Sequence, residues 1–431
     1  MLRRTIFWNY LGTGTSLALQ LLVMPWYLSC LGPTLFGLIQ FMLLIQTFSS
    51  VLDSGISQVL VREVVTRFEK PKTGPRETAQ LFFSFERIYF CFSLGVFFLA
   101  VLAPLITSIN WYGALTDDIY NKRVALVCAI ALFGIQFPGT LYRAFLIGLN
   151  SQTELSKSIL FFSLLRHFGG AIVIYFYPLM SSYFLWHFFV ALGETLNRKH
   201  LSWGRLATEK THVVFSWSEL RSVLRSVGLV SVAVWLGAIT TQLDRSILSQ
   251  MVSIEDFGLY SLASSIALGL LQLIYPVIQA YTPLLIKAKQ DPTRFRQTNL
   301  HLFCSTFGLM LLIFVSFLFF GRSALAIWLQ NAGASASVYQ VLVILILGTL
   351  LNSLYNVGYL NWLIFDRVKT MVLTNVLSVC FCIFATPLLI KEHGITGAAY
   401  GWLFTNVLGF VLSTGWIFEL KKQRSQCSRK E

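Results

Sequence analysis

Charged side chains are scarce in this sequence: Asp, Glu, Lys and Arg together make up 12% of its 431 residues. Ordinary soluble domains contain about 25%, and a soluble chain of this length needs them to cover its water-facing surface. Hydrophobic residues account for 55%. The composition therefore excludes a soluble globular protein and a disordered chain, and it is typical of a protein that crosses a membrane several times.

Cysteine motifs and the common catalytic signatures are also missing. The seven cysteines form no C-x-x-C pair, and six of them lie in apolar runs, where free cysteine behaves as a small hydrophobe. The sequence has no P-loop for nucleotide phosphates, no nucleophile elbow and no H-E-x-x-H motif. The longest predicted loop outside the cytoplasm, residues 109–123, has no room for a catalytic domain. We therefore expect neither an enzyme nor a protein that holds a metal or another cofactor.

Long apolar runs are abundant instead. A membrane-spanning helix needs about 20 mainly apolar residues. The first run is too long for a signal peptide and has no small-residue cleavage pattern after it, so we interpret it as a retained helix. The sequence predicts twelve spans, at residues 6–29, 35–60, 82–108, 124–147, 156–177, 181–201, 226–250, 257–284, 300–320, 338–364, 370–390 and 395–418.

The basic residues alternate between the gaps that separate these spans. The formal net charge is +14, and the chain contains 33 Lys and Arg residues. Of these, 25 fall at the two termini and in one alternate set of gaps, four fall in the other set, and four lie within or at the edge of spans. Basic residues gather on the cytoplasmic side of membrane proteins, so the pattern predicts cytoplasmic N- and C-termini. A basic excess distributed in this way argues against nucleic-acid binding.

The spans divide into two sets of six. The longest polar interruption near mid-chain is residues 202–222, where Ser216 and Glu219 are spaced as in a capping box that opens an interfacial helix. A Phe-Gly-Leu triplet opens the helix after the first span, at residues 36–38, and the helix after the seventh, at 257–259. Such a parallel repeat occurs in many transporters. We expect an N-lobe at 1–204, a cytoplasmic linker at 205–222, a C-lobe at 223–418 and a basic cytoplasmic tail at 419–431.

Polar residues recur on one face of several predicted spans. A spacing of three or four residues aligns side chains on one side of a helix. Polar stripes of this kind hold helices together in membranes, or they line a hydrated cavity. Six stripes spread over both halves favour a cavity. The stripes include Asn9, Thr13, Ser16 and Gln20; Gln46, Ser50, Asp53 and Ser57; Gln136, Thr140 and Arg143; Gly237, Thr241 and Asp244; Gln272 and Gln279; and Asn352, Asn356 and Tyr359.

Charged residues within or close to the spans include Arg143, Arg166, Asp244 and Arg245. An Arg or Asp at the centre of a membrane helix costs about 2.5–3.5 kcal/mol on insertion scales, so such residues usually have a function. Arg143 lies near the cytoplasmic end of the fourth span and has snorkelling as its alternative role, whereas Arg166 lies well inside the fifth. Asp244 and Arg245 are adjacent in the seventh span and point about 100° apart. Each of these two residues therefore needs a separate partner or contact with water.

Two prolines lie inside predicted spans. Pro25 in the first span and Pro276 in the eighth each remove a backbone donor and crowd the preceding turn. We predict a kink at each position and expect the two kinks to act as gating bends. The carbonyl group that each proline frees has to find another partner within the bilayer.

Several short motifs, taken in order, resemble those of the Wzx-type polysaccharide flippases. These proteins belong to the multidrug/oligosaccharidyl-lipid/polysaccharide exporter superfamily. The resemblance covers the whole chain and agrees with its length and its six-plus-six division. The matching motifs are Asn9-Tyr-Leu-Gly12, Pro25-Trp-Tyr-Leu-Ser-Cys-Leu-Gly32, Phe36-Gly-Leu38, Leu52-Asp-Ser-Gly55, Gly148-Leu-Asn150, Leu243-Asp-Arg245 and Gly394-Ile-Thr-Gly-Ala-Ala399.

This resemblance implies an all-α integral membrane fold of about twelve helices, arranged as a V-shaped pair of six-helix lobes. The implied function is to flip undecaprenyl-pyrophosphate-linked oligosaccharide units by alternating access, from the cytoplasmic to the periplasmic leaflet of the bacterial inner membrane. The units would serve O-antigen, lipopolysaccharide or related surface polysaccharide biosynthesis. Implied partners are this lipid-linked substrate, membrane lipid, a polysaccharide polymerase and a chain-length regulator.

The resemblance also implies a cationic cavity for the substrate's pyrophosphate. The positions that fit it are Arg143, Arg166 and Arg245, with Asp53 and Asp244 as acidic counterparts, and Gln46 and Asn9 complete the expected substrate pathway. Two alternative functions stay open: a multidrug or cation antiporter of the same superfamily, and a membrane enzyme of polysaccharide polymerisation. A peptidoglycan-precursor flippase fits less well, since those proteins generally have fourteen spans.

Overall fold

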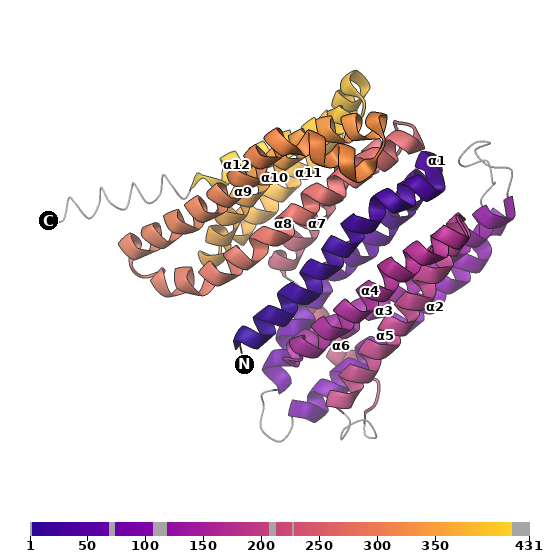
Figure 1. The fold of residues 1–431 in the computed structure, drawn as a ribbon. Coiled ribbons are helices and arrows are strands. Elements are labelled where there is room, and N and C mark those ends of the chain that lie inside the picture. The colour runs from indigo at the N-terminus through magenta and orange to yellow at the C-terminus, as the bar shows by residue number, and fades with distance from the viewer. Residues whose placement is uncertain (1, 69–73, 107–118, 207–212, 226–227, 416–431) are drawn as a thin grey trace. The chain divides into compact units, whose positions relative to one another are not determined.

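The computed structural model of the chain is built from α-helices (Figure 1). It describes residues 2–68, 74–106, 119–206, 213–225 and 228–415. Some side chains inside these ranges, including that of Asn9, lie outside the description. The described residues contain no strand, which agrees with the all-α membrane fold expected from the sequence.

Twelve helical segments follow one another along the described part of the chain. They are α1 Leu2–Phe68, α2 Gly74–Ile106, α3 Ile119–Gly148, α4 Gln152–Phe176, α5 Met180–Arg205, α6 Trp217–Arg225, α7 Leu229–Leu248, α8 Ile254–Ala288, α9 Pro292–Leu329, α10 Ala332–Ile364, α11 Val368–His393 and α12 Ile395–Ser413.

Segment α1 consists of two helices. The backbone leaves helical geometry at Gly32, with φ 75° and ψ 167°, a conformation that glycine adopts easily because it has no Cβ. Pro33 follows, and its missing amide removes one helical hydrogen bond. The break falls between the first two predicted spans, residues 6–29 and 35–60. The described residues of the other ten predicted spans fall mainly on α2 to α5 and on α7 to α12, while residues 107–108, 226–227 and 416–418 of three of these spans lie outside the description.

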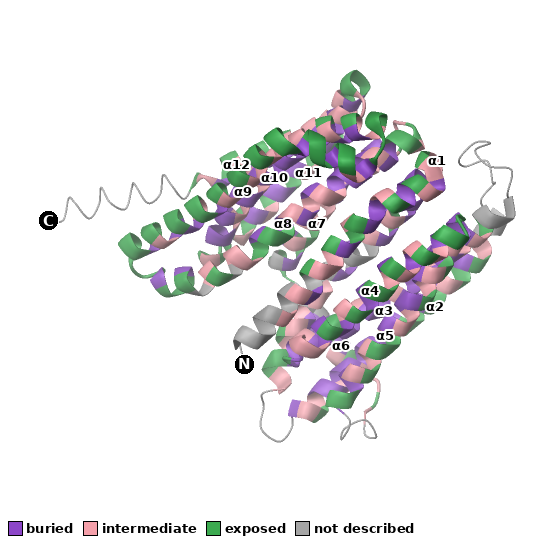
Figure 2. Ribbon diagram, viewed as in Figure 1, coloured by how far each residue is buried: buried purple, intermediate pink, exposed green. Residues whose placement is uncertain are grey.

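Nine stretches of the described residues are long and apolar enough to cross a membrane. Helices α5 and α7 are 26 and 20 residues long and are not among the nine. Helix α5 is less apolar than the nine because it contains polar residues such as His187, Glu194 and Arg198. Side chains on α9 show the expected lipid-facing character: Phe319, Phe320 and Ile327 are more than 70% exposed, and exposed residues recur along this helix (Figure 2). The chain is therefore a multi-pass membrane protein.

The helices form two compact units, Met1–Trp235 (the N-unit) and Leu236–Glu431 (the C-unit). In the N-unit, α3 packs against α5, α2 and α1, and α1 also packs along α4. In the C-unit, α10 packs against α8, α9 and α12, and α11 packs against α12. Helices α3 and α10 are thus the central helices of their units.

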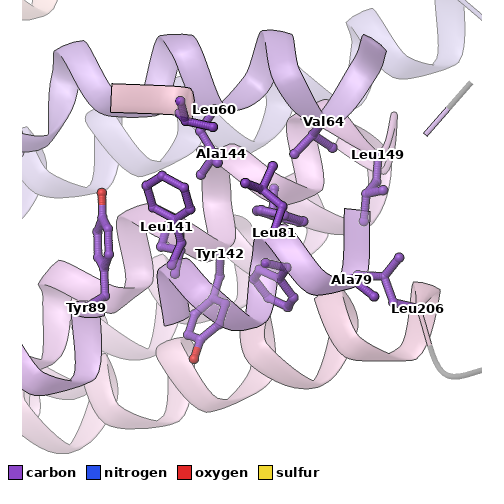
Figure 3. Close-up of a cluster of buried hydrophobic side chains, with 14 of the residues drawn as sticks. Leu60, Val64, Ala79, Leu81, Tyr89, Leu141, Tyr142, Ala144, Leu149 and Leu206 are labelled. Atoms are coloured by element: carbon purple, nitrogen blue, oxygen red, sulfur yellow. The ribbon is translucent and has the colours of Figure 1, made fainter. Parts of the chain in front are cut away.

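An apolar core of the N-unit lies where α1, α2 and α3 meet (Figure 3). Leu60, Leu81, Leu141 and Phe145 are almost fully buried there. Tyr142 also belongs to this cluster, and its hydroxyl donates a 2.7 Å hydrogen bond to the Glu86 carboxylate. The core therefore contains a buried acid whose oxygens are satisfied by neighbouring donors, including the Trp203 ring nitrogen at 3.2 Å.

Helix α6 comes from the polar mid-chain segment and begins where the capping motif predicts. The Ser216 hydroxyl accepts a 3.4 Å hydrogen bond from the Glu219 amide. In a capping box the Glu219 side chain would also accept from the Ser216 amide. Here the Ser216 amide donates to Ser84 Oγ at 3.1 Å instead, and the Glu219 carboxylate pairs with Arg67. Burial lowers the pKa of Arg67, but the hydrogen bonds and charges of Glu219 and Glu63 outweigh burial and hold that pKa above its ordinary value. These contacts dock α6 on the N-unit.

Candidate functional site

A group of paired charges lies around Glu194 on α5. Its carboxylate accepts hydrogen bonds from Arg166 on α4, through one oxygen, and from Arg198, one helical turn further along α5, through the other. The side chains of Glu194 and Arg198 are 11% and 14% exposed, and that of Arg166 is 24% exposed. One buried carboxylate thus positions two guanidinium groups from neighbouring helices.

A third arginine approaches this group from α3. Arg143 interacts electrostatically with both Glu194 and Arg198, and its own side chain is exposed. One turn earlier, Gly139 lets α3 and α5 come close: a Cβ at this position would lie 3.1 Å from Thr195 Oγ1 and 3.7 Å from an Arg198 nitrogen. The approach of these two helices therefore brings Arg143 towards the pair formed by Glu194 and Arg198.

The local backbone of α3 is adapted to this contact. Pro138 lies inside the helix and cannot donate to the carbonyl of Gly134. That carbonyl accepts a 2.7 Å hydrogen bond from Ser93 Oγ on α2 instead. The neighbouring carbonyl, of Ile135, accepts a 3.2 Å hydrogen bond from Thr195 Oγ1 on α5. Side-chain hydroxyls thus supply hydrogen bonds to the carbonyls of this turn of α3, as an apolar environment requires.

We call Arg143, Arg166, Arg198 and Glu194 the arginine cluster. Three positive charges face one negative charge, so the cluster carries an excess of two positive charges. Arg198 Nε has no hydrogen-bond partner among the described atoms although it is buried. Guanidinium groups offer planar sets of donors that match phosphate oxygens. The arrangement is suited to an anionic ligand that bears more than one negative charge.

The other predicted pathway residues of the N-unit are not members of the arginine cluster. Asp53 is 3% exposed and accepts hydrogen bonds from the hydroxyls of Tyr89 and Ser57. Gln46 is also buried, and its amide donates to the Ala129 carbonyl at 3.4 Å. Both side chains contact neighbouring residues in the N-unit, whereas the side chain of Asn9 lies outside the described residues. Their role in a substrate pathway stays a prediction.

Asp244 and Arg245 lie in the C-unit, and both are buried, at 2% and 6% exposure. The Tyr260 hydroxyl donates to one Asp244 oxygen. The other Asp244 oxygen and Arg245 Nε have no hydrogen-bond partner among the described atoms. The structure therefore brings Arg143 and Arg166 together in one unit and places Arg245 in the other, beside an acid rather than in a group of cations.

The two prolines predicted to bend helices lie within α1 and α8. In α1, the non-helical backbone torsion falls at Gly32, seven residues after Pro25. Bends at Pro25 and Pro276, and a gating role for them, stay predictions.

Sequence reasoning missed Glu194 and assigned Arg198 to a cytoplasmic gap. A signal was present, because Glu and Arg four residues apart on a helix can form an ion pair. The partnership of Glu194 with Arg166 depends on how α4 packs against α5, which hydropathy does not report. A charge in a predicted span is thus a reason to search other spans for its partner.

Comparison with known proteins gives both a family and a fold. The model of the family described as "Polysaccharide biosynthesis protein" matches residues 2–289. No curated protein matches the chain.

Solved structures of exporter-superfamily transporters match nearly the whole chain. A multidrug resistance MATE family transporter of the MOP superfamily, in an inward-facing conformation, aligns with TM-score 0.78 at 12% identity, over 94% of this chain and 96% of its own. The lipid II flippase MurJ, in an inward closed conformation, aligns with TM-score 0.72 at 14% identity, over 96% and 87%. A MOP superfamily transporter from Pyrococcus furiosus, reported to have a binding pocket of reverse polarity, aligns with TM-score 0.58 at 11% identity, over 97% and 95%. The chain therefore has the fold of these transporters.

Proposed function

The chain belongs to the polysaccharide biosynthesis protein family, and we propose that it flips an undecaprenyl-pyrophosphate-linked oligosaccharide across the bacterial inner membrane. The movement runs from the cytoplasmic to the periplasmic leaflet by alternating access, with both termini in the cytoplasm. The arginine cluster carries this proposal, since its two excess positive charges complement a pyrophosphate.

The geometry supports an anionic substrate in a specific way. Glu194 holds Arg166 and Arg198 through one edge of each guanidinium group, and a guanidinium has five N–H donors. Donors are left over for an incoming phosphate oxygen, and the exposed Arg143 interacts electrostatically with the same group. Charges of this kind act strongly in a low-dielectric environment. The cluster therefore favours binding of the pyrophosphate end of a lipid carrier.

The glycan would be an O-antigen unit or a unit of a related surface polysaccharide such as that of lipopolysaccharide. A polysaccharide polymerase and a chain-length regulator would act on the flipped product, which makes them the expected protein partners. Arg245, with Asp244, would serve the same pathway from the C-unit, and Asp53, Gln46 and Asn9 would line it in the N-unit. No catalytic step is required of the chain.

A cation antiporter is the second candidate, because a multidrug resistance MATE family transporter shares the fold. Such a protein needs accessible acids for cationic drugs. Here the buried acids already accept hydrogen bonds: Asp53 from Tyr89 and Ser57, Glu194 from two arginines, and Asp244, through one of its two oxygens, from Tyr260. The charge balance of the arginine cluster therefore favours the flippase. The fold neighbours named above are transporters and a flippase, so they give the polymerising enzyme no support.

A reconstitution experiment tests this proposal. The purified protein is placed in phospholipid vesicles that contain a polyprenyl-pyrophosphate disaccharide with a fluorophore on the sugar, and a membrane-impermeant reductant quenches the outer leaflet. We expect the quenchable fraction to rise above that of protein-free vesicles. A parallel assay measures accumulation of ethidium, an organic cation, under a proton gradient. Ethidium accumulation without flipping of the lipid-linked probe would overturn the proposal in favour of the antiporter.

A further inference from the structure

A network of uncharged amides crosses the C-unit between α10 and α12. Asn352 Nδ2 donates to Asn406 Oδ1 at 2.6 Å, and Asn406 Nδ2 donates to the Trp402 carbonyl at 2.7 Å. Asn356 lies one turn after Asn352 and donates to both its side-chain oxygen and its backbone carbonyl, each at 2.9 Å. Three amide side chains thus fix one another in position.

Two tyrosines extend the network to α11. The Tyr355 hydroxyl donates to Asn375 Oδ1 at 2.9 Å, and Tyr359, one turn later on α10, also bonds to Asn375. The two rings meet edge to face with centroids 5.9 Å apart. A Cβ on Gly409 of α12 would lie 3.2 Å from the Tyr355 ring, so the absence of a side chain there makes room for this ring. The aromatic and amide groups therefore form one continuous cluster on three helices.

Helix contact alone does not account for all of this cluster. Asn361, on the same helix, is an amide that serves helix contact: it is 1% exposed and donates to Asn299 and to the Val357 carbonyl, and its own oxygen, which has no hydrogen-bond partner among the described atoms, is sealed from any ligand. Asn356, Tyr355 and Tyr359 are instead only partly buried. No hydrogen bond to the Asn356 side-chain oxygen is found within the described ranges, so this acceptor has capacity left. The polar groups that remain are held in place and accessible.

The chemistry of these groups differs from that of the arginine cluster. An amide offers two donors and two acceptor lone pairs, and a phenol offers one donor and acceptor, while Tyr rings supply flat apolar faces beside their hydroxyls. Sugars present the same combination, with hydroxyls that both donate and accept and with apolar C–H faces. None of the cluster's amide and tyrosine side chains carries a charge at neutral pH, so a phosphate gains no ion pair there.

We propose that Asn352, Tyr355, Asn356 and Tyr359, supported by the buried Asn375 behind them, form a neutral saccharide-binding surface on the C-unit. The ligand is the uncharged part of the glycan, recognised separately from the diphosphate. This inference rests on the proposed function, since it assigns a second subsite for the same lipid-linked substrate.

The test compares two probes that differ only in the sugar: polyprenyl pyrophosphate, and the same lipid with a neutral N-acetylhexosamine disaccharide. Native mass spectrometry of the purified full-length protein in detergent gives the affinity for each probe. The variants are Asn356→Leu and Tyr359→Phe, and Tyr339→Phe is the matched control on the same helix, because its hydroxyl makes only a 3.4 Å contact with the Leu318 carbonyl. Monodispersity and thermal unfolding check that each variant is folded, and Tyr359→Phe still provides the test if Asn356→Leu does not fold.

We expect the wild type to bind the disaccharide probe more tightly than the bare lipid. Asn356→Leu should weaken binding of the disaccharide probe by about tenfold, the equivalent of one or two hydrogen bonds, with unchanged binding of the bare lipid. Tyr359→Phe should act in the same direction, and the control should match the wild type. Wild-type binding of both probes with a preference that neither variant reduces would overturn the saccharide surface alone. Wild-type binding of neither probe would overturn the proposed function together with it.

Discussion

At the scale of single residues, Glu194 is the acid that pairs with two arginines of the N-unit. It is the only acid within hydrogen-bond reach of Arg166 and Arg198 among the described residues. A buried ion pair contributes little net stability, but removal of one partner leaves the other charge buried without compensation. Loss of Glu194 would leave the guanidinium groups of Arg166, Arg198 and Arg143 to repel one another without an acid between them.

We therefore predict that Glu194→Gln destabilises the N-unit strongly. The free energy of unfolding should fall by about 3–5 kcal/mol, the usual cost of breaking a buried pair from one side. Thermal unfolding of the purified protein in detergent measures the change. Glu154→Gln is the matched control: its pair with Arg205 has side chains 40% and 51% exposed, where the loss should stay within about 1 kcal/mol. Equal shifts for the two variants would contradict a buried, organising role for Glu194.

At the scale of secondary-structure elements, small residues determine how closely two helices can approach each other. A Cβ on Gly148 at the end of α3 would lie 2.6 Å from Val64 Cγ1 on α1, and valine has little rotamer freedom with which to move away. By contrast, a Cβ on Gly95 of α2 would meet nothing within 4 Å. Close helix contacts of this kind are the usual means of association in membranes.

The contact between α1 and α3 predicts a reversible steric effect. Gly148→Ala should lower the unfolding temperature, since overpacking costs about 1–3 kcal/mol. Val64→Ala added to it should recover part of the loss by vacating the space. Gly95→Ala should be neutral or slightly stabilising, because alanine restricts the unfolded chain. A thermal-unfolding series of these variants checks the prediction, which fails if Gly148→Ala behaves like Gly95→Ala.

Most helices could be predicted from the sequence because their signals are local. Apolar runs marked the spans, and the break of α1 at Gly32 falls in the predicted gap between the first two runs. The start of α9 has a local signal that the hydropathy pattern does not contain. Asp291 accepts hydrogen bonds from the Thr293 and Arg294 amides at 3.0 Å, and this N-cap starts α9 eight residues before the predicted span. The partners of buried charges could not be predicted in this way, since the Arg166–Glu194 pair joins residues 28 positions apart.

The two units differ chemically at the scale of the whole molecule, although the sequence suggests a repeat. The arginine cluster lies entirely in the N-unit, and the network of amides and tyrosines lies entirely in the C-unit. A cationic cluster and a neutral polar network match the two chemically distinct ends of the lipid-linked oligosaccharide that we propose as the substrate.

The alternation of basic gaps predicts the membrane topology. Reporter fusions after Lys72, Lys210 and Arg424 should be active as cytoplasmic reporters, and fusions after Asn121 and Ala334 as periplasmic ones, because basic segments stay on the cytoplasmic side. Alkaline phosphatase and a fluorescent protein that matures only in the cytoplasm give opposite readouts. Any one of the five fusions on the wrong side would refute the arrangement of twelve spans with cytoplasmic termini.

The flipping rate of Arg143 variants in reconstituted vesicles tests the anionic site most directly. Arg143 forms no part of the Glu194 ion pairs, so Arg143→Gln strands no carboxylate and should leave the protein folded. We predict a flipping rate of the polyprenyl-pyrophosphate disaccharide at most about a tenth of the wild-type rate, equivalent to about 1.4 kcal/mol. Arg143→Lys should be intermediate, because it keeps the charge but loses the planar fork. Arg123→Gln, an exposed site on the same helix, should flip like the wild type, and wild-type flipping by Arg143→Gln would contradict the assignment of this cluster to the pyrophosphate.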